Sequence, residues 1–266
     1  MVVDRSERSC LLCGARFTGR AFLCRRCADA YRNGPIPAEV RRRFYEAIDR
    51  VYPTWSNTYE EYNPPVGLLA FLATLPRTVR VLEIGAGGGF ALRAMERMGF
   101  KRLIGLDLTA TSLAEARRRV PGARLIAADA ERLPLQDDSV DVALSSDLVE
   151  HLPDLDGHLA EVARVLRPGG HYLIKTPNRR PAEAYYRLRG LYDYHFWHPS
   201  MCTPGELARK LARHGFACTF VPPARLTQAQ VRKIPVARLR PLAARVPIGW
   251  LPTSLRPHLE VVATRR

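Results

Sequence analysis

Four cysteines lie close together near the start of the chain, as two pairs. Cys10 and Cys13 form the first pair, and Cys24 and Cys27 follow ten residues later. Two Cys-x2-Cys pairs at this spacing are typical of sites in which four thiolates bind zinc tetrahedrally. A segment this short buries little core, so the metal would supply much of its folding free energy. We predict a zinc module over residues 1–33, with an iron–sulfur cluster or four ordinary buried thiols as alternatives.

A glycine-rich turn follows a strand-like apolar run further along the chain. The run VLEIGAGGGF, residues 81–90, carries Gly85, Gly87, Gly88 and Gly89 ahead of a helical segment. Glycine is favoured where the backbone turns sharply and approaches a ligand, because it has no Cβ. Such a turn is weak evidence by itself, since a purely structural strand-to-helix turn has the same composition.

Two carboxylates give the glycine turn a more specific meaning. Asp107 ends the next apolar run, 22 positions after Gly85, and Asp129 ends the run after that. The carboxyl ends of neighbouring parallel strands meet at one edge of a sheet, where ligands bind, and an acidic residue at this distance can accept both hydroxyls of a ribose. Because the turn holds no Lys or Arg, the set predicts a site for a nucleoside without phosphates.

A third group follows the fourth apolar run and could act on a substrate. Asp147, Glu150 and His151 lie at positions i, i+3 and i+4, which would put them on one face of a helical turn. In one interpretation His151 is a general base or a positioning residue, with Glu150 beside it. In a second, the three residues bind a divalent cation that orients an acceptor hydroxyl. In a third, the histidine only packs over a cofactor.

An aromatic segment with two histidines, residues 192–198, follows the fifth apolar run. Its side chains could line an acceptor pocket, supply further metal ligands or pack as a surface loop. We predict the pocket, with His195 as a further catalytic candidate. Cys202 and Cys218 stand alone in the sequence and are expected to be structural.

The elements that must position these residues alternate regularly. From residue 77 onward, short runs rich in leucine and β-branched residues alternate with helical segments, which predicts an α/β fold with a parallel sheet and crossover helices. The runs are nearly continuous in apolar residues, as in strands covered on both faces. The predicted strands are 79–86, 102–108, 123–130, 140–146, 171–177, 218–222 and 259–265.

Three segments are expected along the chain. The zinc module over 1–33 is followed by a helical cap or linker over 34–76, which prolines interrupt at Pro53 and at Pro64. The remaining 77–266 form the main domain, which contains an insert at 222–257 rich in Pro and Arg.

The order of these motifs resembles that of class I S-adenosylmethionine-dependent methyltransferases. The resemblance covers roughly residues 77–221 and includes the glycine turn, both aspartates, LPLQDDSVDVALSSDLVEHL and VLRPGGHYLI. The sequence is most similar to the branch that methylates quinones, lipids and other small molecules. Dinucleotide dehydrogenases have a similar first turn, but assignment to that class would explain neither Asp129 nor the turn at 168–170.

The resemblance implies a Rossmann-like fold, with a mostly parallel seven-stranded sheet whose last strand is antiparallel. It also implies S-adenosylmethionine as cofactor, with the methionine part near Glu83, the ribose on Asp107 and the adenine amino group on Asp129. The full set of implied cofactor residues is Glu83, Gly85, Ala86, Gly87, Asp107, Leu108, Asp129, Ala130 and Asp147. Some members of the family use a Glu-x-x-Glu-His metal motif at this point of the sequence. This chain has Asp147 in place of the first Glu, and the shorter side chain reaches less far toward a metal.

Charge is distributed unevenly along the chain. The net charge is +15, yet residues 51–206 are nearly neutral, and residues 207–259 carry ten basic side chains and no carboxylate. Charge of this kind bears on partners rather than on fold. Apolar residues interleaved with the cations suit a lid or a surface helix against anionic lipid, and a run of cations also suits RNA phosphates.

Function is predicted on this basis. We expect an S-adenosylmethionine-dependent methyltransferase of class EC 2.1.1 acting on a small-molecule or lipid-linked acceptor. The alternative is an RNA methyltransferase that binds RNA through the zinc module and the insert at 222–257, which we call the basic segment. A binding module with an inactive methyltransferase fold is the third possible function. The sequence shows neither a membrane-spanning run nor a secretory signal. We therefore expect a cytoplasmic location, with a peripheral membrane contact as an option.

Overall fold

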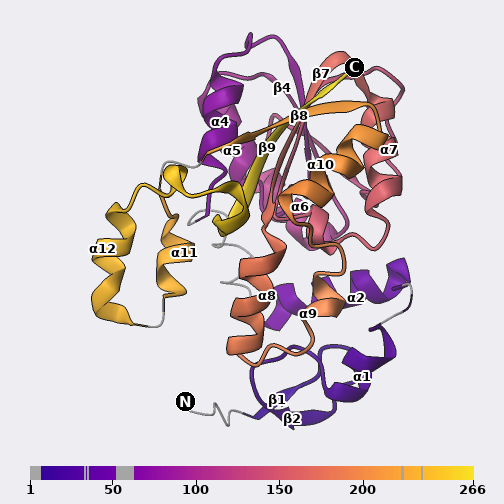
Figure 1. The fold of residues 1–266 in the computed structure, drawn as a ribbon. Helices are drawn as coiled ribbons and strands as arrows, with labels where there is room; N and C mark the ends of the chain where they lie inside the picture. The colour runs from indigo at the N-terminus through magenta and orange to yellow at the C-terminus, as the bar shows by residue number, and fades with distance from the viewer. Residues whose placement is uncertain (1–6, 33, 35, 52–62, 223–224, 235) are drawn as a thin grey trace.

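The computed structural model describes residues 7–32, 34, 36–51, 63–222, 225–234 and 236–266. Seven strands form the central sheet in the order β5-β4-β3-β6-β7-β9-β8 (Figure 1). Their bounds are β3 (Arg80–Ile84), β4 (Arg102–Asp107), β5 (Arg124–Ala127), β6 (Val140–Ser146), β7 (Leu166–Pro177), β8 (Phe216–Val221) and β9 (His258–Arg265). Strands β3 to β7 pair in parallel, whereas β9 runs antiparallel to both β7 and β8. The predicted fold is thus confirmed, including the antiparallel last strand.

Helices cover both faces of the sheet, because its strands are apolar on both sides. One face packs against α4 (Val66–Ala73), α5 (Phe90–Arg97) and the end of α6 (Ala110–Arg119), and the other packs against α7 (Leu155–Val165) and α10 (Pro204–Arg213). The predicted boundaries place α4 in the cap or linker, but Leu68 and Leu72 of α4 are fully buried against the sheet. The start of α10 is fixed by a capping box between Thr203 and Glu206.

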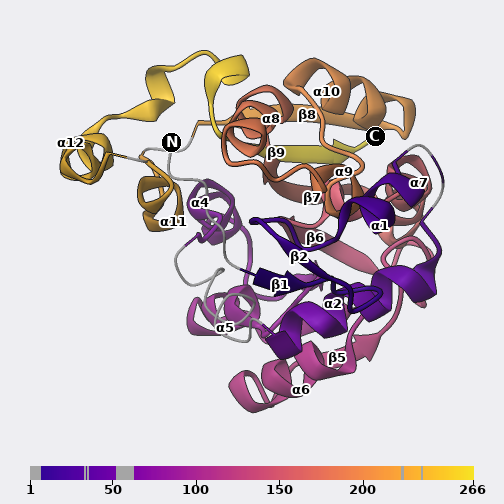
Figure 2. The same cartoon turned by 90° about the horizontal axis from the view of Figure 1, so that it is seen from below.

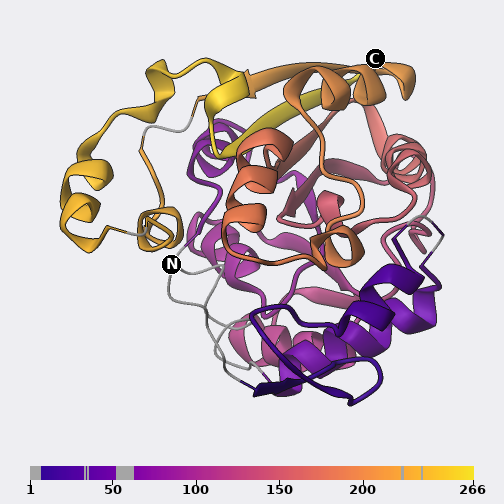
Figure 3. The same cartoon turned by 60° about the horizontal axis from the view of Figure 1, so that its bottom comes forward.

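A third layer lies beyond the carboxyl ends of the parallel strands (Figures 1 and 3). It consists of β1 (Glu7–Ser9), β2 (Arg16–Thr18), α1 (Arg25–Ala30), α2 (Ala38–Val51), α8 (Arg179–Leu188) and α9 (Tyr194–Trp197). Its members share one apolar cluster in which Leu23, Phe44 and Tyr186 come from three distant parts of the sequence. The N-terminal region is therefore packed onto the main domain. Pro53, the predicted first break of the cap, lies outside the described residues.

The basic segment forms short helices beside this layer. Its elements are α11 (Gln228–Arg232), η2 (Ala237–Leu239), α12 (Arg240–Arg245), η3 (Ile248–Trp250) and η4 (Thr253–Leu255). They extend from one side of the molecule, away from α7 (Figure 2). No helix within the described ranges is both long enough and apolar enough to cross a bilayer.

Candidate active site

A cavity of about 970 Å³ lies between the carboxyl ends of the parallel strands and the third layer. Its walls come from the turn after β3, from the ends of β4, β5 and β6, and from α2, α8 and α11. Nine of the residues that the sequence predicted for cofactor binding and catalysis line it, namely Gly85, Gly87, Asp107, Leu108, Asp129, Ala130, Asp147, Glu150 and His151. Glu83, Ala86 and His195 do not line it.

The turn after β3 has a backbone that only glycine adopts easily. Gly85 has a φ of +73° and Gly87 a φ of +48°. A Cβ at Gly85 would lie 2.9 Å from Cδ1 of Leu148, a residue that itself lines the cavity. The turn therefore depends on glycine for its conformation, and a side chain at Gly85 would also displace that of Leu148.

Two main-chain amides fix the carboxylate of Asp107 beside this turn. Gly87 N donates to Oδ2 at 2.8 Å, and Thr109 N donates to Oδ1 at 2.9 Å. The Thr109 hydroxyl also donates to Oδ1, at 3.1 Å, so the carboxylate is held in one orientation beside the turn. A cradle without Cβ atoms next to a fixed carboxylate fits the nucleoside part of S-adenosylmethionine.

Asp129 has a partner that the sequence did not predict. The side chain of Arg41, which is buried, donates from Nη2 to Oδ2 of Asp129 and to Oε2 of Glu131, at 3.0 Å in each case. The other oxygen, Oδ1, accepts from the Glu131 amide at 3.0 Å. Arg41 belongs to α2, 88 residues earlier in the chain, and no sequence signal distinguishes it from the other arginines of that helix.

The predicted common face of Asp147, Glu150 and His151 is not what the structure shows. Asp147 precedes the short turn η1 (Val149–His151) and has a φ of +53°, a left-handed conformation that Asp adopts more readily than most other non-glycine residues. Its Oδ2 accepts from Lys175 Nζ at 2.7 Å, and Lys175 is only 1% exposed. Although burial alone would raise the pKa of Asp147, Lys175 and His258 lower it.

Lys175 is a buried partner of Asp147 that the sequence did not predict. A signal existed, because a lysine within the apolar run HYLIKTP must be paired if the strand is buried. Besides Asp147, its ammonium donates to the Asn63 carbonyl at 2.7 Å. The ammonium thus compensates the charge of Asp147.

Glu150, His151 and His198 form a compact group in the wall of the cavity. Their candidate ligand atoms lie within 4.8 Å of one another. Glu150 Oε1 is 3.9 Å from Nε2 of His151 and 4.0 Å from Nε2 of His198. Glu150 Oε2 accepts from the Thr176 hydroxyl at 2.8 Å, which orients the carboxyl group.

Hydrogen bonds at Nδ1 turn both imidazoles so that Nε2 faces Glu150. His151 Nδ1 contacts the Trp197 carbonyl and lies 2.8 Å from the Tyr45 hydroxyl. A carbonyl can only accept, so Nδ1 carries the proton of the neutral ring and Nε2 is a lone-pair nitrogen. His198 Nδ1 lies 3.1 Å from the Tyr186 hydroxyl.

Burial sets the charge of this group. It lowers the pKa of His151 to about 4, and together with His151 it lowers the pKa of His198 well below its usual value. Burial and the nearby Asp147 raise the pKa of Glu150 to about 8. Near pH 7 the site therefore holds two neutral imidazoles and a carboxyl group that is mostly protonated.

The aromatic segment divides between two roles. Trp197 and His198 line the cavity, while Asp193 Oδ2 accepts from the amides of Phe22 and Leu23 and so holds the N-terminal region. His195 lines a separate, smaller cavity, because it lies on another side of the short helix α9. Its predicted catalytic role is therefore not supported by its position.

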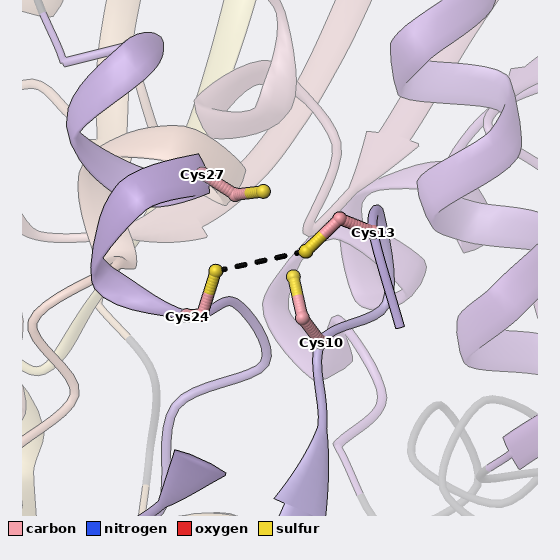
Figure 4. A group of neighbouring side chains, drawn as sticks. All are labelled: Cys10, Cys13, Cys24 and Cys27. Atoms are coloured by element: carbon pink, nitrogen blue, oxygen red, sulfur yellow. Dashed lines mark hydrogen bonds between the residues drawn. The ribbon is translucent and has the colours of Figure 1, made fainter. Parts of the chain in front are cut away.

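The four N-terminal cysteines face one another (Figure 4). Cys10 and Cys13 lie beside the β1–β2 hairpin, and Cys24 and Cys27 lie at the start of α1. The four sulfurs lie within 4.8 Å of one another, and those of Cys13 and Cys24 are 3.7 Å apart. Thiolates about 2.3 Å from one tetrahedral zinc ion would be about 3.8 Å apart, so the donor set fits that ion.

Comparison with known proteins agrees with this geometry. The family model described as a methyltransferase domain matches residues 82–174. A ubiquinone biosynthesis O-methyltransferase of Chelativorans sp. is 32% identical over 148 residues, which cover 52% of this chain and 58% of that relative. A phthiotriol/phenolphthiotriol dimycocerosates methyltransferase of Mycobacterium ulcerans is 41% identical over 103 residues, 38% of each chain. The chain thus spans less than two thirds of the length of these relatives.

A solved structure extends the comparison to the whole fold. An S-adenosylmethionine-dependent methyltransferase of Thermotoga maritima superposes with a TM-score of 0.60 at 21% identity, covering 85% of this chain and 100% of that one. Likeness at this identity concerns the fold. The fold is therefore that of the class I, S-adenosylmethionine-dependent methyltransferases, and residues 82–174 match the methyltransferase domain.

Proposed function

We propose that the protein transfers a methyl group from S-adenosylmethionine to a small-molecule or lipid-linked acceptor. The observation that carries this proposal is one cavity that joins the glycine turn and Asp107 to the group of Glu150, His151 and His198. The relatives named for ubiquinone and phthiotriol methylation support an acceptor of this class.

Different residues would bind the cofactor and act on the acceptor in such a transfer. When bound, the cofactor supplies a methyl carbon on a positively charged sulfur, and Asp107 and Asp129 would hold its ribose and adenine. In-line displacement depends mainly on placing the acceptor against that carbon. Where the acceptor is a hydroxyl, its oxygen would bond to the methyl carbon as the carbon–sulfur bond breaks and S-adenosylhomocysteine leaves. The hydroxyl proton would pass to His151 Nε2, the lone-pair nitrogen.

A divalent cation is the second arrangement that a specific observation favours. Both Nε2 atoms turn toward Glu150 Oε1, while their Nδ1 atoms are engaged elsewhere, which is how histidine ligands of metals are usually held. A cation there would orient the acceptor hydroxyl. A chelator that abolishes activity, with recovery on adding Mg²⁺ or Mn²⁺, would support the cation, whereas activity indifferent to chelation supports His151 as the base.

We further propose that the four cysteines bind zinc. The 3.7 Å separation of the Cys13 and Cys24 sulfurs supports this assignment. Metal analysis of the purified protein should give one zinc per chain, and Cys13→Ser should lower that content. An iron signal or an absence of bound metal would contradict it.

The basic segment offers a surface for a lipid-linked acceptor. Seven of the ten exposed large apolar side chains in the described part of the chain lie between Val236 and Leu255, and Trp250 is 89% exposed. They share this segment with arginines and no carboxylate. From α11 and the residues beside it, Gln230 and Lys233 line the cavity. A bilayer against this segment would lie next to the cavity.

Vesicle sedimentation tests this surface. We expect the protein to sediment with vesicles of anionic phosphatidylglycerol and not with neutral phosphatidylcholine. The variant Leu242→Ser with Trp250→Ala should lose this binding, while Val66→Ser, an exposed apolar residue of α4, should keep it. A wild type that stays in solution at low salt would contradict the surface.

The acceptor class is tested with methyl-labelled S-adenosylmethionine and a cell extract divided into lipid, small-molecule and RNA pools. We expect label in the lipid or small-molecule pool. Label confined to RNA would instead support the RNA methyltransferase. That reading also requires RNA affinity that falls steeply as salt rises.

A further inference from the structure

Helix α2 contacts both halves of the cavity from the side opposite the sheet. Arg41 reaches Asp129 on the cofactor side, and Tyr45 reaches His151 on the acceptor side. Residues four apart lie on one face of a helix, so one face of α2 touches both groups. These contacts join positions 88 and 106 residues apart in sequence.

The four-cysteine module packs against this helix. Phe44 and Ile48 of α2 are buried in one apolar cluster with Cys10 and Leu23 of the module. The Phe44 ring lies edge-on to Phe22, with centroids 6.2 Å apart. Because the module buries little surface of its own, its shape and hence this packing depend on what joins the cysteines.

A second connection runs from the module to the same histidine. Asp193, only 1% exposed, accepts from the amides of Phe22 at 2.7 Å and Leu23 at 3.0 Å. Four residues later, the carbonyl of Trp197 contacts His151 Nδ1. The module is thus tied to His151 both through α2 and through α9.

We propose that the four-cysteine module is a clamp that holds α2 over the active site, and that Arg41 and Tyr45 are the positioning residues through which it acts. Arg41 fixes the carboxylate of Asp129, and Tyr45 helps to fix the ring of His151. The inference rests on the proposed methyltransferase function. It assigns the module a part in cofactor binding in addition to its own folding.

Binding of S-adenosylhomocysteine, measured by calorimetry, tests the contact between Arg41 and Asp129. Arg41→Met leaves Asp129 and Glu131 without their buried cation, so the dissociation constant should rise about tenfold. Arg41→Lys keeps the charge and should recover part of the affinity. Arg42→Met, on the exposed side of the same helix, should bind as the wild type does. Unchanged affinity in Arg41→Met would overturn the positioning role of Arg41.

The contact between Tyr45 and His151 can be tested by spectroscopy of the His151 ring. Tyr45→Phe should leave the affinity for S-adenosylhomocysteine within about twofold, because Tyr45 contacts the acceptor side. Nitrogen NMR of the His151 ring should show a shift of Nδ1 and its proton in this variant. An unchanged ring spectrum would contradict the positioning role of Tyr45.

The clamp itself is tested by combining variants. Cys13→Ser should lower the zinc content and weaken S-adenosylhomocysteine binding about as much as Arg41→Met does. In the double variant the two losses should not add, because both act through α2. Additive losses, or full affinity after zinc loss, would overturn the clamp. A folded wild type that does not bind S-adenosylhomocysteine would instead contradict the proposed function.

Discussion

Hydrogen bonds, and not proximity in the sequence, orient the side chains of Glu150, His151 and His198. His151 and His198 come from different segments, yet both turn Nε2 toward Glu150. His195, which was predicted as a catalytic candidate, lies three positions before His198 and lines another cavity. Sequence identifies such residue types, whereas the side that each one faces depends on how α9 packs.

This difference gives a residue-scale prediction. His151→Ala and His198→Ala should each lower kcat about 100-fold, the usual loss when a general base or its immediate support is removed. His195→Ala should leave kcat within about twofold and serves as the matched control. The measurement is steady-state methyl transfer to the acceptor that the extract screen identifies. Equal activity of all three variants would exclude a catalytic role for this group.

At the scale of elements, the sheet and the glycine turn were predictable from sequence. Near-continuous apolar runs and the turn residues between them located all seven strands, because burial on both faces leaves a strong pattern. The contacts of α2 were not predictable, since Arg41 and Tyr45 act on residues far along the chain. The pairing of Lys175 with Asp147 likewise depends on the register of β7.

The glycine turn provides a prediction at this scale. Gly85→Ala would force a side chain into φ +73° and place its Cβ 2.9 Å from Leu148. We expect about 1–2 kcal/mol of destabilisation from the backbone alone, together with weaker binding of S-adenosylhomocysteine. Gly122→Ala is the control, because no atom lies within 4 Å of its added Cβ. Urea unfolding of both variants measures the difference, and equal stability would contradict the account of the turn.

At the scale of the whole molecule, three separate parts of the chain build one cavity. The N-terminal region supplies Arg41 and Tyr45, the central sheet supplies Asp107 and its neighbours, and the basic segment supplies Lys233. The two parts of the chain that carry the excess positive charge therefore each line part of the cavity, together with the nearly neutral middle of the chain.

A buried histidine beneath the cavity makes global stability depend on pH. His158 contacts the Ala130 carbonyl and the Tyr172 hydroxyl at 2.8 Å each, and burial lowers its pKa to about 4. The unfolded chain therefore binds this proton more readily. The stabilisation is complete above about pH 6.5 and is lost as pH falls toward 4, by on the order of 2–3 kcal/mol.

Urea unfolding across this range checks the effect. The free energy of unfolding should fall less steeply between pH 6.5 and 4 in His158→Gln than in the wild type. Parallel curves for the variant and the wild type would contradict the assignment.

The central claim is that the cavity binds the methyl donor at the glycine turn and Asp107. The most direct measurement is calorimetric titration of the wild type and Asp107→Ala with S-adenosylhomocysteine, with Asp29→Ala, an exposed carboxylate of α1, as the control. We predict one site per chain, an affinity at least about tenfold weaker in Asp107→Ala, and no change in the control. A wild type that does not bind, or an Asp107→Ala variant that binds equally well, would contradict the account.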